Sequence, residues 1–150
     1  MRPSPRLSLL LLRASLGLLL VVWGIDKLRD AGHGMQVSEH FYGGLFSSPI
    51  LIRAFGALEV LVGLAIVAGL ARRFTYPALL AVTGVTLLAV WRSVLDPLGL
   101  VLEGTQLLFY PSLIIFAGAL VLVAFQDHDE TALDVSRRHA RSGAAIGRTT

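Results

Sequence analysis

The sequence predicts an all-α integral membrane protein, a four-helix bundle of up-down topology with both termini in the cytoplasm. Hydrophobic residues make up 55% of the 150 residues and charged residues only 15%, which is too little charge to cover a soluble domain of this length. Four nearly uncharged windows approach the roughly 20 residues that a helix needs to cross a bilayer. Helix is expected because every backbone polar group must be satisfied inside lipid. The expected spans cover residues 7–25, 50–70, 76–95 and 107–125.

The first expected span follows the basic start Met1–Arg6 and looks at first like a secretory signal. Three features argue against cleavage: the apolar run is too long, Arg13 interrupts it, and the exit at residues 23–27 lacks the small residues of a cleavage site. Each leucine of the span contributes about −0.3 to −0.6 kcal/mol to insertion, against roughly +3 kcal/mol for one arginine. We therefore expect the segment to insert and to be retained.

Basic residues set the expected orientation. Arg72 and Arg73 lie in the link at residues 71–75, which is so short that the second and third spans must be antiparallel neighbours. Further basic residues precede the first span and follow the fourth, whereas on the other side they are mixed with acids. Because Lys and Arg collect in cytoplasmic segments, we expect both termini in the cytoplasm of a multi-pass inner-membrane protein. The formal charge of +3 is then an orientation signal and does not indicate nucleic-acid binding.

The outer connections contain apolar segments. Residues 36–46 carry apolar side chains at i, i+4 and i+8, which predicts a short amphipathic helix on the outer interface, ended by Gly43-Gly44. Between the third and fourth spans, Asp96-Pro97 predicts a turn, and Leu98–Leu102 is apolar enough to dip back into the interface.

The chain divides into a membrane domain and a tail. Residues 1–125 form the expected four-span domain, and residues 126–150 carry acids followed by arginines. This composition predicts a solvated cytoplasmic tail whose end, residues 142–150, is disordered.

Arg13 and Glu59 are the most informative residues, because a charge at a span centre costs about 2.5–3.5 kcal/mol and is retained where it is buried, paired or functional. Glycines share their helix faces and permit close helix approach, so both charges should point into the bundle. Their expected depths differ by about 7 Å at 1.5 Å per residue, a gap that the two side chains could bridge. Arg13 is alternatively a structural ion-pair member or a snorkelling side chain, and Glu59 a proton carrier, a hydrogen-bond partner of a quinone, or an anchor for a partner helix. The glycines are Gly17 and Gly24 beside Arg13, and Gly56 and Gly63 beside Glu59.

Further charges gather at the outer ends of three spans. They are Asp26, Lys27, Arg53 and Arg92, named here the outer charge cluster. They could form a polar entrance above Glu59, or they are helix ends that lie in the headgroup layer.

The remaining polar residues carry weaker signals. The chain has no cysteine, which excludes thiolate chemistry and cysteine-ligated clusters. No histidine lies in an expected span, so a transmembrane bis-histidine haem is excluded. His33, Glu39 and His40 lack a diagnostic metal spacing, and no metal site is predicted. Thr83 and Thr86 share a face and are expected to bond across helices or to their own helix.

Several motifs together point to a family. The first span ends in Gly24-Ile-Asp-Lys27-Leu, the second contains Gly56-Ala-Leu-Glu59 followed by further glycines, and Arg72-Arg73 leads into the third. In these features, and over about residues 7–125, the chain resembles the DoxX family of small four-span membrane proteins. The resemblance implies a membrane subunit of redox-related assemblies, in some relatives linked to quinone-coupled sulfur oxidation. It also implies that Lys27, Glu59 and Arg72 are family-type polar positions.

Three functions remain open. The first is a membrane anchor or accessory subunit of a redox system, at most a subunit of an oxidoreductase, with a quinone or lipid bound between spans near Glu59 and the outer charges. The second is a small proton-coupled transporter that uses Arg13 and Glu59. The third is a purely structural assembly subunit that holds a partner through its glycine faces and tail. Each implies residence in the lipid bilayer as a homo-oligomer or in a larger membrane complex.

Overall fold

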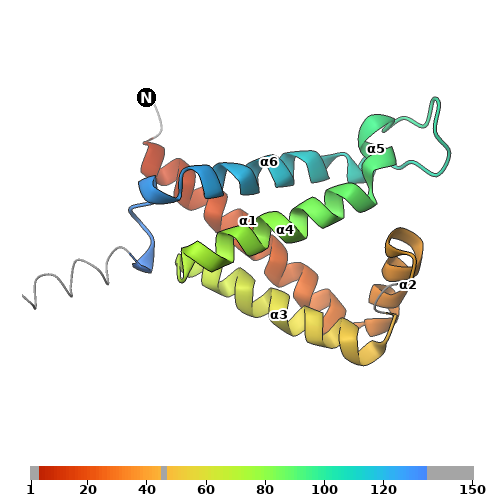
Figure 1. Ribbon diagram of the computed structural model, residues 1–150, viewed down its shortest axis with the longest axis horizontal. Coiled ribbons are helices and arrows are strands. Elements are labelled where there is room, and N and C mark those ends of the chain that lie inside the picture. Colours follow the sequence, from red (N-terminus) through yellow and green to blue (C-terminus); the bar gives the residue numbers. More distant parts are fainter. Residues whose placement is uncertain (1–3, 45–46, 135–150) are drawn as a thin grey trace, which may run out of the picture.

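The computed structural model describes residues 4–44 and 47–134, and in those two ranges all regular secondary structure is helical. The all-α prediction is confirmed. The longer helices α1, α3, α4 and α6 pack together, and α2 and α5 lie at one end (Figure 1). The elements are α1 (Pro5–Arg29), α2 (Ala31–Tyr42), α3 (Pro49–Ala68), α4 (Arg72–Ala89), α5 (Trp91–Leu95), η1 (Leu107–Phe109), α6 (Pro111–Ala124) and η2 (Gln126–His128).

Among the described residues, three helical segments are long and apolar enough to cross a membrane: Pro5–Arg29, Pro49–Ala68 and Leu107–Ala124. They correspond to the first, second and fourth expected spans and identify a membrane protein. The third expected span corresponds to most of α4 followed by α5, with a break at Val90. Two arginines open α4, and Pro77 lies within it.

Glycines bring α1 and α3 into backbone contact. A Cβ atom added to Gly24 would lie 2.5 Å from the carbonyl oxygen of Gly56, and one added to Gly17 would lie 2.8 Å from that of Gly63. Such distances leave no space for a side chain, so the two helices can approach this closely only with glycine at the contact. The predicted glycine faces are therefore confirmed, and the glycine face of α1 packs directly against that of α3. The two pairs also fix an antiparallel register, in which α1 ascends as α3 descends.

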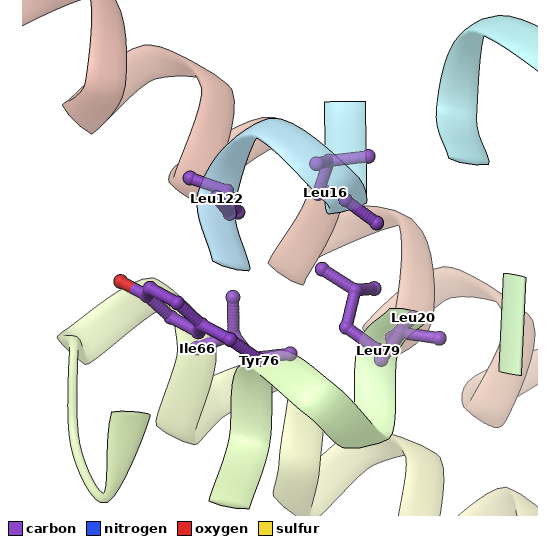
Figure 2. Packing of buried hydrophobic residues seen from close by; sticks show 7 residues of the cluster. Leu16, Leu20, Ile66, Tyr76, Leu79 and Leu122 are labelled. Carbon is purple, nitrogen blue, oxygen red and sulfur yellow. The ribbon is translucent and has the colours of Figure 1, made fainter. Parts of the chain in front are cut away.

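The core lies where the four longer helices meet. Its buried side chains come from α1, α3, α4 and α6. Figure 2 shows Leu16 and Leu122 above Ile66, Tyr76 and Leu79, with Leu20 beside Leu79. The opposite faces of these helices expose large apolar side chains such as Leu61, Leu88 and Ile114, as expected for surfaces in contact with lipid. The core residues are Leu16, Leu20, Ile66, Tyr76, Leu79, Ala119 and Leu122.

Helix α2 confirms part of the prediction for the first outer connection. It begins at Ala31, five residues before the expected start, and ends at Gly43 in the left-handed conformation with φ of 62°, as the Gly43-Gly44 pair predicts. Residues 45–46 lie outside the described residues. The Phe41 ring packs edge-on against Phe109 of η1 with ring centroids 5.1 Å apart, which ties α2 to the start of the last span.

The prediction of a solvated tail from residue 126 is wrong at two positions, although most of residues 126–134 are exposed. Asp129 and Ala132 are buried, and a Cβ atom added to Gly69 at the end of α3 would lie 2.6 Å from the Cβ atom of Ala132. Residues 126–134, named here the docked segment, therefore pack against the end of the bundle where α3 turns into α4 (Figure 1). The rest of the tail, with the expected disorder at 142–150, lies outside the described residues.

Candidate functional site

Two ion pairs lie at opposite ends of α1, and the first is buried. Nη1 of Arg13 donates to both carboxylate oxygens of Asp129, at 2.9 Å and 2.8 Å, and the two side chains are only 3% and 1% exposed. Breaking such a pair by removing one partner costs about 3–5 kcal/mol, since it leaves an uncompensated charge. The pair joins the first helix to the docked segment.

Further hydrogen bonds complete the surroundings of Asp129. The Tyr76 hydroxyl donates to its Oδ2 at 2.6 Å, and the Thr131 hydroxyl donates to its Oδ1 at 2.9 Å. Nη1 of Arg72 donates to the main-chain carbonyls of Gln126 and Asp129, the latter at 3.1 Å. We name this set of side chains, with Arg13, the Asp129 network. It ties α1, α4 and the docked segment together.

The charge state of Asp129 follows from these contacts. Burial by itself would raise the pKa of its carboxyl, but the hydrogen bonds from Tyr76, Arg13 and Thr131 and the positive charge of Arg13 outweigh burial, and the pKa lies below its ordinary value. The carboxylate is therefore ionised at neutral pH, and each of its oxygens accepts at least two hydrogen bonds. A group satisfied in this way is suited to structure rather than to proton exchange.

The proposed bridge between Arg13 and Glu59 is wrong. The register of α1 and α3 sets Gly17 level with Gly63 and Gly24 level with Gly56, so Glu59 lies level with the stretch of α1 between the two glycines. Arg13 is then about eight residues away along the helix axis, about 12 Å at 1.5 Å per residue. Arg13 instead belongs to a structural ion pair, one of the alternatives that the sequence left open.

The second ion pair joins Lys27 to Glu59. Nζ of Lys27 lies 2.8 Å from Oε2 of Glu59, and their side chains are 26% and 14% exposed. Because Cα–Cβ bonds tilt toward the start of a helix, the Lys27 side chain runs back along α1 toward the middle of α3. Its stem passes Gly56, where an added Cβ atom would lie 2.9 Å from the Lys27 Cβ atom. The same glycine therefore permits both the helix contact and the ion pair.

The other members of the outer charge cluster do not join Glu59. Oδ2 of Asp26 lies 2.7 Å from Nδ1 of His33 on α2. The side chains of Arg53 and Arg92 are exposed, and the Arg92 guanidinium lies 5.6 Å from the ring centre of the adjacent Trp91. Of the polar entrance, which was one of two alternatives for this cluster, only Lys27 contacts Glu59. Within the described ranges, no group of three metal-binding side chains is assembled.

Of the two alternatives predicted for Thr83 and Thr86, bonding within their own helix is the one that the structure shows. Thr83 donates to the carbonyls of Leu79 and Leu80, and Thr86 donates to that of Val82. They therefore satisfy their hydroxyls locally and contribute to packing.

Sequence reasoning missed the partners of Arg13. The sequence places Asp129 in a solvated tail because it follows the last span in a charged stretch, and it offers Tyr76 only as the first residue of a span. One signal was present. Arg13 and Arg72 lie at one end of the expected bundle, and the acids that follow the last span lie at that same end. A buried arginine needs such a partner.

The two pairs have different chemical capacities. The Asp129 carboxylate is buried and both of its oxygens are hydrogen-bonded, so its network serves to join α1, α4 and the docked segment at one end of the bundle. The Lys27–Glu59 pair is partly exposed and offers one donor and one acceptor beside apolar helix surfaces, which are the elements that orient a small ligand.

One comparison with known proteins matches more than half of the chain to a family. The family model described as DoxX matches residues 8–92. This range covers α1 from its fourth residue and all of α2, α3 and α4, with Lys27, Glu59 and Arg72. Neither the curated proteins nor the solved structures gave a match. With more than half of its length matched by the family model, the chain belongs to the DoxX family.

Proposed function

We propose that this protein is a four-span accessory subunit of a redox assembly in the inner membrane, and that its Lys27–Glu59 pair binds the head group of a quinone. In this proposal α4 is the remaining span, and both termini face the cytoplasm. The redox partner and the quinone are both parts of the proposal, and they go beyond the family membership.

The observation that carries the proposal is the partly exposed Lys27–Glu59 ion pair. An ammonium group donates to a quinone carbonyl, and a carboxylate accepts from the hydroxyl that forms when the quinone is reduced. Reduction of a quinone to a quinol takes two electrons and two protons, and the pair can hold protons but not electrons. A partner protein with its own redox centre must therefore supply the electrons, which is consistent with a chain that has no cysteine.

The packing of α4 supports its role as a span. Tyr76, Leu79 and Thr83 of α4 are all buried, so the helix contributes a full face to the core. Arg72 and Arg73 open α4 at the same end as Arg13, and this collection of basic residues at one end favours the orientation with that end in the cytoplasm.

The two alternative functions receive less support. A transport path through Arg13 and Glu59 relied on their proximity, and each has a different partner. The assembly function relied on glycine faces free to hold a partner, and these faces are occupied by the contact between α1 and α3.

Tryptophan fluorescence can test the quinone site. The chain has two tryptophans, and Trp23 lies one turn before Lys27 on α1, so a Trp91→Phe background reports on that position. A short-chain quinone titrated into this variant in lipid nanodiscs should quench Trp23 saturably. Glu59→Gln and Lys27→Met should weaken the apparent affinity by about tenfold or more, as expected for lost hydrogen bonds to charged groups. Glu103→Gln, at an exposed glutamate, is the matched control.

The outcomes separate the ligands. If the Trp91→Phe protein binds no quinone, or if Glu59→Gln and Glu103→Gln bind equally well, the quinone proposal is wrong. Mass spectrometry of the protein purified from its native membrane gives a second reading. A phospholipid that is retained by the parent protein and lost in Glu59→Gln, with no quinone present, would assign the pair to a lipid head group.

A further inference from the structure

The loop between α5 and η1 presents apolar side chains away from the protein. Figure 1 shows the chain leaving α5 and running out beyond the helices before it returns to α6. Leu98, Leu100 and Val101 are 69%, 79% and 86% exposed. We name residues 96–102 the apolar loop. A soluble surface seldom presents so many adjacent large apolar side chains without a partner.

Asp96 holds this loop in a fixed shape. Its Oδ1 accepts from the main-chain N–H of Leu100 at 2.9 Å, and its Oδ2 accepts from those of Val101 and Leu102, both at 2.7 Å. The N–H groups of Leu102, Val101 and Leu100 also lower the pKa of the Asp96 carboxyl below its ordinary value. The apolar side chains are therefore exposed by a turn whose shape is fixed by hydrogen bonds to Asp96, which act as a brace.

The brace has a specific use at a membrane. A loop in water can leave its N–H groups to water, although aspartate side chains also accept from such groups in soluble turns. A loop that enters an apolar layer must satisfy those groups itself. Asp96 satisfies three consecutive N–H groups in the very stretch that carries the most exposed side chains.

The surroundings of the loop also favour lipid. From Pro97 to Tyr110 the sequence contains a single charged residue, Glu103. The apolar surface continues into the last membrane segment through Leu107 and Leu108, which are both exposed. On the other side of the loop, Trp91 and Arg92 offer the aromatic and basic side chains that are common at the headgroup level.

We propose that the apolar loop inserts into the lipid interface at the Lys27 end of the bundle, and that Asp96 preorganises it for insertion. The loop thereby anchors the α4–α6 side of the protein in the same leaflet that is nearest to the Lys27–Glu59 pair. The occupant of this surface is the acyl and headgroup boundary of the bilayer itself.

The absence of cysteine from the chain allows a clean test. Val101→Cys is labelled with an environment-sensitive fluorophore and reconstituted into phospholipid vesicles, with and without nitroxide groups near the top of the acyl chains. The label on the protein in vesicles should emit at a shorter wavelength than the same label on the protein unfolded in denaturant. Nitroxide lipid should quench it roughly twofold more than aqueous iodide does, since an inserted segment lies at the boundary of headgroups and acyl chains. Asp127→Cys, at an exposed position beyond α6, is the water-facing control and should show the reverse order.

The role of Asp96 is tested in the labelled protein. Asp96→Ala removes all three acceptor contacts, and the label should become more accessible to iodide while the helix content by circular dichroism is unchanged. Asp96→Asn retains one acceptor oxygen, so iodide quenching of its label should lie between that of the labelled parent protein and that of Asp96→Ala. Equal quenching in all three proteins would refute the brace. A label on Val101→Cys that iodide quenches as readily as the control refutes insertion. Quenching that depends on the protein-to-lipid ratio in vesicles would assign the surface to a second copy of the chain. Protection from both quenchers that is seen in native membranes but not in vesicles would assign it to a partner protein.

Discussion

Removal of the Asp129 carboxylate tests whether the buried network holds the helices together. Asp129→Ala leaves Arg13 buried with a 3% exposed side chain and no carboxylate, and it also removes the acceptor of the Tyr76 hydroxyl. The loss of one partner from a buried pair corresponds to about 3–5 kcal/mol. At 2–4 °C per kcal/mol for a protein of this size, the midpoint of thermal unfolding should fall by roughly 6–20 °C.

The assay is thermal unfolding of the purified protein in one detergent, followed by circular dichroism. Asp127→Ala is the matched control, because this neighbouring aspartate is exposed, and it should change stability by no more than about 0.5 kcal/mol. A double variant, Arg13→Leu with Asp129→Leu, replaces the pair by apolar groups and should recover a large part of the loss. If Asp129→Ala unfolds at the same temperature as Asp127→Ala, the network does not hold the docked segment and the reasoning fails.

Two further predictions concern the contact between α1 and α3 and the stability of the protein at low pH. Gly56→Ala places a methyl group 2.7 Å from the carbonyl oxygen of Gly24 and should destabilise the protein by about 1–3 kcal/mol. Gly118→Ala, whose nearest contact is a side-chain methyl at 3.2 Å, should cost clearly less in the same unfolding assay, and equal costs would contradict the close contact. The lowered pKa of Asp129 means that its stabilisation is fully present above the ordinary aspartate pKa of about 3.9 and is lost as the pH falls below it. The difference in unfolding temperature between the parent protein and Asp129→Asn should therefore be constant from pH 7 to about 5 and shrink at lower pH, whereas a difference that grows on acidification would contradict the sign of the shift.

The helices were predictable because their signals are local. Hydropathy locates the three long apolar segments, and glycine spacing alone identifies the faces by which α1 and α3 meet. The end of α2 at Gly43 follows from one residue type in one conformation. The start of α2 at Ala31 was missed because Asp30 caps it: its side chain accepts from the N–H of His33, and such a cap outweighs the absence of an apolar pattern in the first turn.

The ion pairs were predictable only in part, because a pair depends on register. The sequence singles out Arg13 and Glu59 as charges that need partners and places Lys27 in the outer charge cluster, but the pairing requires the alignment of two antiparallel helices to within one turn. A shift of four residues in that alignment moves Glu59 by about 6 Å, which is enough to exchange one cation for another. The alignment becomes clear once Gly24 is set against Gly56, and the pairing of Lys27 with Glu59 then follows.

The separation of the two ion pairs bears on how Glu59 can be reached. Arg13 and Lys27 are fourteen residues apart on α1, about 21 Å at 1.5 Å per residue. The space between them is filled by the fully buried Leu20 and Ile66 and by the direct contact of Gly17 with Gly63. Close-packed side chains of this kind leave no room for a column of water. A head group or proton that reaches Glu59 under the proposed function must therefore come from the Lys27 end or from the lipid beside it, and the Asp129 network acts on binding only by keeping α1 in register with α3.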